Sequence, residues 1–586
     1  MTAEAPIAVP EGFTLHTENN SYILRSADNE AFLNPVQEFN RDLSVACIRT
    51  WSELLNEEKE NKWRQGQEKR ARKLEKGPKA KRAKIETSAS DAVEEADPGE
   101  AKPEVKTDDV PPPSEESGSA ESPTKIASDS YKQKEYRPYK SVILEALSAT
   151  GLRSIRYAKE IPLVKYVIAN DLSPTAVAAM RRNIEINGLG GEEGSGQGSS
   201  GSAEAGSSQG PAKSPKVRVN EGDACVLMYN HHAEKERVDV VDLDPYGTAA
   251  PFIDAAVQCV TDGGLLCVTC TDLAVLATLN YPEKCFSNYG GTSVRAEYCH
   301  EAALRLVLNT ISTSAARYGR YIQPLLSLSI DFYVRIFVRI NSSPTEVKKA
   351  FSGCQAFYNQ PLGRIVEQVH EASGNINLQY KAHTGPTAAD KCPECNSILH
   401  IAGPMWSGSL HDTAFVGRVL QHVEASEGKY GTATRMKGML SVAKEELDIP
   451  FYFTPPKIAG FFHCVCPSLD DVASALLNAG HQISRSHAAA GSLKTTATRA
   501  ELYDMYRSWI KTHPVKMEKI SQTSPTHHLL SRELKTEANF KKHPQWMTSK
   551  ASHVKLVRYQ ENPLPNWGPG KKAGSGTKRK RDQADD

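Results

Sequence analysis

The sequence lacks the features that place a protein in or across a membrane. No apolar run approaches the ~18 residues that a spanning helix needs. The stretch Met1 to Pro10 has neither the basic region nor the apolar core of a secretory signal. The 12 cysteines mostly stand in apolar stretches, where a reduced thiol packs as a small hydrophobe, so a disulfide framework is not expected. We expect a soluble, non-secreted protein with no membrane partner.

An excess of charge of either sign is also lacking, since 71 Lys and Arg stand against 70 Asp and Glu. The average therefore favours neither nucleic acid nor membrane as a partner. Hydrophobic residues make up only 39% of the 586 residues, below the ~45–50% of an ordinary globular domain. Part of the chain is therefore expected to remain unfolded.

Two insertions and a tail account for this composition. The segment Lys59–Lys84 holds 12 Lys and Arg, and Glu86–Glu121 holds 12 acids, so residues 58–130 predict a disordered charged insertion. Residues 190–215 contain 15 Gly or Ser among 26, which is flexible-linker composition. The tail 568–586 ends in a basic cluster, Lys578 to Arg581, that suits a nuclear import receptor or loose RNA contact, unless it is merely solvated. We expect a nuclear protein, with a mitochondrial or cytoplasmic share left open.

The first folded motif is a strand–turn–helix–strand unit. An apolar run from Ser141 ends at Glu145, a turn of small residues surrounds Gly151, and a second apolar run ends at Asp171. The 20 residues from Gly151 to Asp171 match the spacing between a nucleotide-binding turn and the acid that holds ribose hydroxyls. The turn lacks the glycines of a pyrophosphate loop, which favours a cofactor without phosphate such as S-adenosylmethionine. An unspecialised α/β domain is the alternative.

Two further strand ends carry acids. Asp223-Ala224 follows a strand from Val217, and that carboxylate could accept from an adenine amino group. A buried strand from Val238 delivers Asp244-Pro245-Tyr246-Gly247. Asp244 and the Pro245 carbonyl can each accept an N–H of an exocyclic base amine, and Tyr246 can stack on the base. Such a base must lie outside a helical stack. The alternative is an ordinary Asp-Pro turn.

With these residues the chain resembles the tRNA (guanine(26)-N(2))-dimethyltransferase family, which methylates a guanine between the D-stem and the anticodon stem. The resemblance covers most of the folded chain, in the segments Phe32–Ser44, Leu147–Arg153, Asp171, Asp242–Gly247, Thr271–Ala274, Cys285–Gly290, His300-Glu301, Gly403–Trp406 and Ser484–His487.

The resemblance implies an α/β fold: a class I, Rossmann-like S-adenosylmethionine-dependent methyltransferase domain followed by a family-specific C-terminal α/β domain. It places Arg41, Arg153, Asp171, Asp223 and Ala224 at the cofactor, Asp244 and Arg41 at catalysis, and Phe32, Pro245 and Tyr246 near the base. The expected divisions are 1–57 and 131–343 for the methyltransferase domain, 344–567 for a tRNA-binding domain and 568–586 for the tail.

The family also implies a zinc site from two C-x2-C pairs. Here Cys392 and Cys395 form one pair, but the other keeps only Cys354, since Phe351 replaces its first cysteine. Three thiolates with His383 or His400 could complete a tetrahedral site. The alternative is a lost metal.

A second departure follows His487, where Lys494-Thr495-Thr496 stands in place of a family Lys-Thr-Asp. We expect Lys494 to contact phosphate. The other cations of this half suit phosphate contacts to a folded tRNA; they are Arg499, Arg507, Lys511, Lys516, Lys519 and Lys535.

The sequence therefore predicts transfer of two methyl groups to guanine N2 of tRNA. An exocyclic-amine methyltransferase acting on another RNA or DNA base, and a non-catalytic tRNA-binding chaperone, are the alternatives.

Overall fold

The computed structural model describes residues 7–26, 33–75, 135–190, 214–350, 391–400 and 402–548, and the backbone alone of four strands between 354 and 382. Phe32, His383, the Gly/Ser insertion from 191 to 213 and the basic tail lie outside the described residues. No helix within the described ranges is long and apolar enough to cross a membrane.

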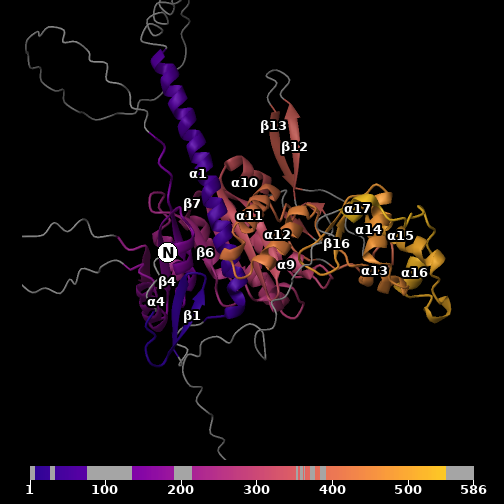
Figure 1. Ribbon diagram of the computed structural model, residues 1–586. Coiled ribbons are helices and arrows are strands. Elements are labelled where there is room, and N and C mark those ends of the chain that lie inside the picture. Colours follow the sequence, from indigo (N-terminus) through magenta and orange to yellow (C-terminus); the bar gives the residue numbers. More distant parts are fainter. Residues whose placement is uncertain are drawn as a thin grey trace, which may run out of the picture. The chain divides into compact units, whose positions relative to one another are not determined.

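A seven-stranded sheet forms the centre of the fold, in the order β5-β4-β3-β6-β7-β9-β8 (Figure 1). The strands are β3 (Ser141–Glu145), β4 (Val164–Asp171), β5 (Val217–Glu221), β6 (Val238–Leu243), β7 (Val260–Cys270), β8 (Arg320–Ile330) and β9 (Tyr333–Ser342). The first five run parallel, and β9 is antiparallel to both β7 and β8. The predicted class I α/β fold is confirmed.

Helices connect successive strands from β3 to β8. They are α3 (Leu152–Glu160), α4 (Pro174–Ile186), α5 (Ala224–Asn230), α6 (Ala250–Cys259), α7 (Leu273–Leu276), α8 (Pro282–Tyr289) and α9 (Cys299–Ala316). Ser173 caps α4 by accepting from the Ala176 N–H, and Pro174 occupies its first turn. Ser173 and Pro174 therefore set the start of α4.

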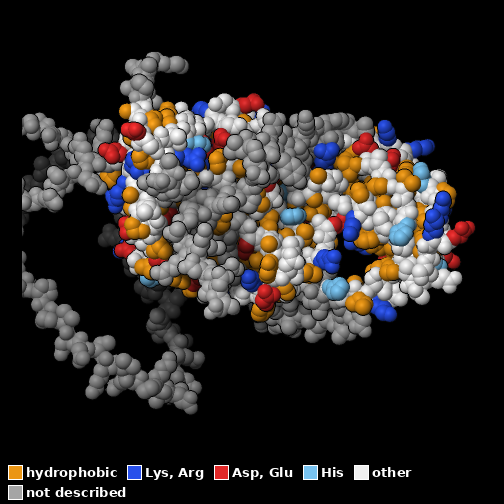
Figure 2. Space-filling view, turned by 90° about the horizontal axis from the view of Figure 1, so that it is seen from below, with side chains coloured by type: hydrophobic (Ala, Val, Ile, Leu, Met, Phe, Trp, Pro, Cys, Tyr) orange, Lys and Arg blue, Asp and Glu red, His pale blue; other side chains and the backbone are white. Residues whose placement is uncertain are grey.

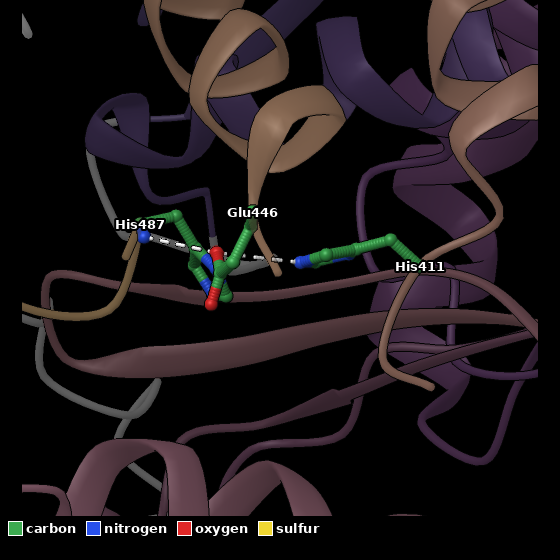
Figure 3. A group of neighbouring side chains, drawn as sticks. All are labelled: His411, Glu446 and His487. Carbon is green, nitrogen blue, oxygen red and sulfur yellow. Dashed lines mark hydrogen bonds and ion pairs between the residues drawn. The ribbon is translucent and has the colours of Figure 1, made fainter. Parts of the chain in front are cut away.

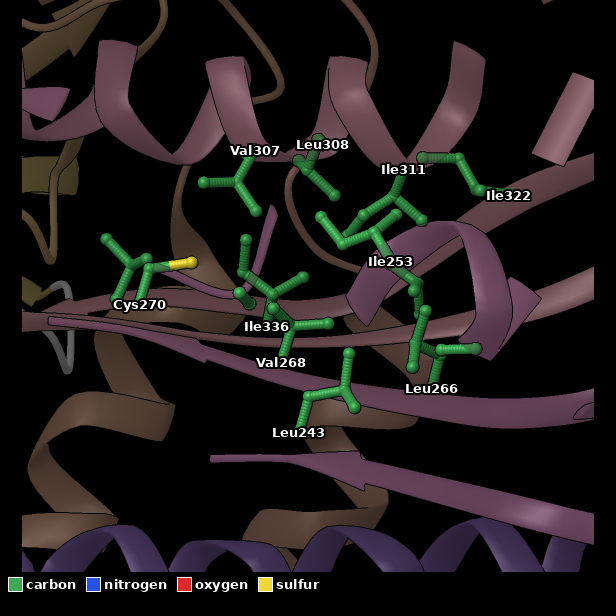
Figure 4. Packing of buried hydrophobic residues seen from close by; sticks show 14 of the residues in the cluster. Leu243, Ile253, Leu266, Val268, Cys270, Val307, Leu308, Ile311, Ile322 and Ile336 are labelled. Atoms are coloured by element: carbon green, nitrogen blue, oxygen red, sulfur yellow. The ribbon is translucent and has the colours of Figure 1, made fainter. Parts of the chain in front are cut away.

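One face of the sheet carries the main hydrophobic core. Ile253 of α6 and Ile311 of α9 meet Leu266 and Val268 of β7 and Ile336 of β9, all essentially inaccessible to solvent (Figure 4). Because strand side chains alternate, the intervening residues of these strands point to the opposite face. That face meets the first half of α1 (Glu38–Glu75) through polar contacts.

The chain divides into two compact units, Met1–Glu53 with Lys140–Asp586, and Leu54–Tyr139. In the second unit, Asn56 Nδ2 donates to the Tyr139 carbonyl at 2.9 Å, and the rings of Trp63 and Tyr136 lie 5.9 Å apart. Residues 58–75, predicted to begin a disordered insertion, are instead helical.

Residues that favour helix explain why this segment is ordered. Residues 58–75 are rich in Glu, Lys, Gln and Arg, which favour helix without any apolar burial. Arg64 bonds Glu60 one turn earlier at 2.6 Å. The segment also continues an existing helix, so it avoids the cost of nucleation.

The remaining elements extend from both ends of the sheet region. They are the hairpin β1 (Phe13–Glu18) and β2 (Ser21–Ser26), then α10 (Pro344–Ala350), β10 (Cys354–Ala356), β11 (Gln360–Pro361), β12 (Gly363–Val369), β13 (Ile376–Ala382), β14 (Met405–Trp406), α11 (Thr413–Ala425), α12 (Ala433–Glu445), α13 (Pro455–Phe462), α14 (Leu469–Asn478), β15 (Ile483–Arg485), β16 (Leu493–Thr495), α15 (Arg499–Thr512), α16 (Pro525–Ser531) and α17 (Pro544–Thr548). Short 3₁₀ helices lie at Pro35–Gln37, Glu427–Lys429 and Met517–Lys519. Residues from Phe453 to Trp546 build a second hydrophobic core around α13, α14 and α15.

Candidate active site at the carboxyl ends of the parallel strands

The turn after β3 is shaped by two residues with positive φ, Ala149 at 47° and Gly151 at 76°. The Ala149 N–H donates to Asp171 Oδ2 at 2.9 Å, and Asp171 Oδ1 accepts from the Ser173 N–H at 2.9 Å. Asp171 therefore joins the ends of two neighbouring strands. Each of its oxygens retains a lone pair that could accept from a hydroxyl.

The next strand ends in Asp223, which caps α5 by accepting from the Val226 N–H at 2.9 Å. Ala224 is buried behind it. Asp223 itself is exposed, so its second oxygen faces solvent at the same edge of the sheet as Asp171.

The Asp-Pro-Tyr-Gly loop follows β6 at this edge. Pro245 is buried, whereas Tyr246 is 55% exposed. Gly247 has φ of 103°, a conformation open to glycine, and its N–H donates to Thr271 Oγ1 at 2.9 Å. The Thr271 N–H donates back to the Gly247 carbonyl at 2.8 Å. The loops after β6 and β7 therefore hold one another.

Tyr289 of α8 supports the same loop from below. Its hydroxyl lies 2.7 Å from Thr248 Oγ1 and donates to Asp272 at 2.9 Å. Burial raises the pKa of Asp272. In the sequence, Asp272 and Tyr289 belong to segments of the family resemblance but carry no predicted role. The contacts show that they fix the position of the loop.

Arg153 is 4% exposed and lies beneath the loop. It forms an ion pair with Asp244 Oδ2, donates to Ser44 Oγ at 3.0 Å and lies 3.5 Å from Asp242. Two residues predicted to share this site, Arg153 and Asp244, are thus in direct contact.

Arg41 has different partners. Its guanidinium forks onto Glu18 of β1, at 2.8 and 2.5 Å, and also donates to the Asn34 carbonyl. Burial alone would raise the pKa of Glu18, but Arg41 and Arg156 together hold it well below its usual range. The predicted roles of Arg41 in cofactor binding and catalysis stay predictions.

A layer of buried polar side chains lies between the sheet and α1, and sequence reasoning missed it. Asp242 accepts from Arg335 at 2.8 Å and from the Tyr157 hydroxyl at 2.5 Å. Arg335 also donates to Thr269 at 2.9 Å and to Ser44 at 2.8 Å. The alternation of β9, with Arg335 between apolar neighbours, was the signal available in the sequence.

Comparison with known proteins assigns this arrangement to a family. The family model described as N2,N2-dimethylguanosine tRNA methyltransferase matches residues 12–507. The chain belongs to this family. It is a tRNA methyltransferase that forms N2,N2-dimethylguanosine.

The similarity spans nearly the whole chain. A tRNA (guanine(26)-N(2))-dimethyltransferase of Schizosaccharomyces pombe is 40% identical over 576 residues, covering 96% of this chain and 93% of that protein. Its Saccharomyces cerevisiae counterpart, named as mitochondrial, is 38% identical over 593 residues, with coverage of 96% and 93%. Trm1 from Pyrococcus horikoshii, solved with S-adenosyl-L-methionine, is 23% identical and superposes with a TM-score of 0.55, covering 85% of this chain and 99% of that one. That likeness shows a shared fold.

The predicted zinc ligands of this methyltransferase are only partly described. Cys392 and Cys395 lie on one tight turn, where the Cys392 N–H donates to the Ser397 carbonyl at 2.7 Å. The backbone of Cys354 lies in β10, and its side chain is outside the description. His400 is exposed, and among the described residues it forms no three-ligand group with these cysteines. The structure therefore does not bring His400 to them.

The prediction that Lys494 contacts phosphate is wrong. Lys494 is 2% exposed, and its ammonium lies 3.0 Å from Glu446 and 3.3 Å from Glu301. Arg305 also pairs with Glu301, at 2.8 Å. A buried lysine held by two carboxylates cannot reach a phosphate at the surface. Two acids and two cations balance here.

Two histidines share the same carboxylate (Figure 3). His487 Nδ1 lies 2.6 Å from Glu446 Oε2, and His411 Nε2 faces that oxygen at 3.6 Å. The other ring nitrogens accept from backbone N–H groups of the edge strand β8, His411 from Ser327 and His487 from Ser329. The two histidines thus accept hydrogen bonds from backbone N–H groups that would otherwise have no partner at this edge of the sheet.

This geometry excludes His411, Glu446 and His487 as a metal site, although their ligand atoms lie within 4.8 Å of one another. A neutral imidazole has one lone pair and one N–H. Here the lone pairs face the β8 donors, so the nitrogens that face Glu446 carry hydrogen and cannot bind a metal.

Proposed function

We propose that this chain transfers two methyl groups in succession from S-adenosylmethionine to N2 of guanine 26 in tRNA. The observation that carries the proposal is the Asp244-Pro245-Tyr246-Gly247 loop, clasped to Thr271 beside the strand ends of a class I methyltransferase sheet. Names of relatives across 96% of the chain supply the substrate position.

Asp244 is the group we assign to the amine. Arg153 holds its Oδ2, so Oδ1 is the oxygen that can accept an N–H of the guanine amine. The Pro245 carbonyl takes the second N–H, which favours the pyramidal, more nucleophilic nitrogen. Tyr246 stacks on the flipped base, and the family resemblance assigns Phe32 to the base as well. Fixed orientation and proton acceptance are the two contributions of these residues, the second worth roughly 10²–10⁴-fold.

The strand-end acids fit a nucleoside. Bound S-adenosylmethionine would supply the sulfonium methyl group. Asp171 has lone pairs left for ribose hydroxyls after its two backbone contacts, and Asp223 keeps one oxygen for the adenine amine, with Ala224 packed behind it. We assign Arg153 and Arg41 to the carboxylate end of the cofactor, where Arg41 would have to exchange or share Glu18.

The decisive experiment uses the full chain with labelled S-adenosylmethionine and unmodified tRNA, followed by digestion to nucleosides. We expect label in N2-methylguanosine and then N2,N2-dimethylguanosine. Label in N6-methyladenosine would support the alternative base specificity, and no label would support the chaperone alternative.

The variant Asp244→Ala tests the residue assignment. We expect it to bind the cofactor and tRNA but to transfer methyl at least ~10²-fold more slowly, because the proton acceptor is lost. Wild-type transfer by this variant would remove Asp244 from its assigned role.

We also propose that residues 344–567 bind tRNA and that 344 begins this domain. Lys516, Lys519 and Lys535 are exposed, and Figure 2 shows lysines and arginines scattered among histidines on one face of the molecule. Arg507 leaves the set predicted from the sequence because it is buried and paired with Asp504 at 2.7 Å. Each exposed lysine that contacts phosphate should lower the salt dependence of tRNA binding by about one unit when replaced by alanine.

Zinc is proposed at Cys354, Cys392 and Cys395. Two thiols on a single turn fit half of a tetrahedral site. Metal analysis should find one zinc in the wild type and less in Cys392→Ser; a metal-free wild type would show that the site is lost.

We further propose import into the nucleus through a receptor that recognises Lys578 to Arg581. Replacing these four residues with alanine in the full chain should move a fluorescently tagged protein to the cytoplasm. Unchanged nuclear signal, or a mitochondrial signal in both proteins, would contradict this.

A further inference from the structure

The segment that follows β7 carries exposed apolar side chains beside the candidate active site. Because β6 and β7 are parallel neighbours, the segment leaves the sheet at the edge that carries Asp244. Leu279 is 48% exposed, Tyr281 41% and Phe286 62%.

These side chains stand on a firmly anchored element. Cys285 and Tyr289 of α8 are buried at 0% and 1% exposure, and the Tyr289 hydroxyl bonds Thr248 in the loop that follows Tyr246. Phe286 lies on an adjacent, solvent-facing side of α8 and has no role in closing the core. Replacing Phe286 should leave the fold intact.

The charged residues of the segment provide little net attraction for an anionic partner. Lys284 lies over the Tyr281 ring, 4.7 Å from its centroid, and Glu283 offsets its charge. Attraction must therefore come mainly from the ring faces and apolar area. Aromatic faces of this kind stack on nucleotide bases regardless of their identity.

We propose that Leu279, Tyr281 and Phe286 form a stacking surface for the tRNA nucleotides next to the target guanine. The proposal rests on the proposed function, since a guanine drawn out of its stack leaves its neighbours with uncovered faces. The exposed rings lie one loop away from Tyr246, which receives the extruded base. They replace the lost stacking and so favour the extruded state.

The test compares Phe286→Ala with the wild type in the full chain, using unmodified tRNA. We expect binding and KM for tRNA to weaken about tenfold, the loss that one stacked base produces. The slope of log Kd against log salt should not change, because stacking releases no counterions. Lys284→Ala should instead reduce that slope by about one if Lys284 contacts phosphate.

Four further variants separate stacking from other effects. Phe286→Trp should retain wild-type affinity, because the stacking face remains. Val9→Ala removes an apolar side chain that is 45% exposed outside the proposed tRNA-binding domain, and it should have no effect. Leu279→Ala and Tyr281→Ala repeat the test outside the body of α8, with cofactor binding as the check on folding.

Wild-type Kd and KM in Phe286→Ala, Tyr281→Ala and Leu279→Ala would overturn the proposal. An equal loss in Val9→Ala would also overturn it, since the effect would then be unspecific. A wild type that binds tRNA but forms no dimethylguanosine would overturn the proposed function instead, and the binding comparison would still decide the stacking surface.

Discussion

Glu145 and Asp242 are register partners on β3 and β6, yet they carry different charges. Burial raises the pKa of Glu145 to about 8. Burial acts on Asp242 too, but Arg335 and Arg153 hold its pKa below the ordinary value. The surrounding charges are consistent with a neutral Glu145. Asp242 and Asp244 already balance Arg153 and Arg335, so an ionised Glu145 would leave one negative charge in excess.

Glu145→Gln should therefore stay within about 1 kcal/mol of the wild type near pH 4.5, where the carboxyl is largely neutral in the folded chain as well, the value of one neutral hydrogen bond. The raised pKa of Glu145 gives the wild type stability that is full below 4.5 and is lost as pH rises through about 8. Relative to the wild type, Glu145→Gln should gain stability over that range. Urea unfolding at pH 5, 7 and 8.5 measures this.

Asp242→Asn is the matched contrast. It leaves Arg335 and Arg153 with an uncompensated buried charge, so it should cost about 3–5 kcal/mol of unfolding free energy at pH 7. Equal effects of the two amide substitutions would contradict the assigned charges.

At the scale of elements, the turn between β3 and α3 depends on Gly151. Its φ is 76°, and an added Cβ would lie 2.7 Å from Met180 Cγ of α4. Both the backbone conformation and the approach of α4 require glycine. Gly188 has a similar φ of 65° but open space around it.

Gly151→Ala should therefore destabilise the fold by clearly more than Gly188→Ala, which pays only the left-handed strain of about 1–2 kcal/mol. Adding Met180→Ala to Gly151→Ala should relieve the clash with the new Cβ but not the backbone strain. The relieved part of the stability loss appears as a coupling energy in a double-mutant cycle. Thermal unfolding of Gly151→Ala, Gly188→Ala, Met180→Ala and the double variant measures these stability losses. Equal losses at the two glycines would contradict the close approach of α4.

At the scale of the whole molecule, His411, Glu446 and His487 join the C-terminal region to the edge strand β8. Burial lowers the pKa of His411. The groups that face it are Glu446, His487 and Lys494. A proton on His411 would place two donors, Nδ1–H and the Ser327 N–H, against each other.

His411 therefore contributes stability that is full above 6.5, its ordinary pKa, and is lost as pH falls toward its lowered value. His411→Asn keeps an acceptor near the Nδ1 position but does not titrate, so its unfolding midpoint should fall less between pH 7.5 and 5.5. The exposed His528→Asn is the control and should follow the wild type. An unchanged profile in His411→Asn would contradict the contact.

The sequence by itself determined the parallel sheet and the acids at the strand ends, because strand alternation and turn chemistry are local properties. Motif spacing likewise brought Gly151, Asp171 and the Asp244 loop to one edge. The burial and the ion-pair partners of individual cations, in contrast, are not determined by their neighbours in the sequence. Lys494 and Arg507 read as phosphate contacts in the sequence, and only the fold buries them beside carboxylates.

The tertiary structure also decided the partners of Arg41, the layer of Arg335 and Asp242 beneath the sheet, and the helix that continues to Glu75. Each depends on residues far apart in the chain or on a helix nucleated elsewhere, which no local pattern encodes. Only the fold likewise brings Lys494 and Arg305 to Glu301 and Glu446, because these four residues come from distant parts of the chain.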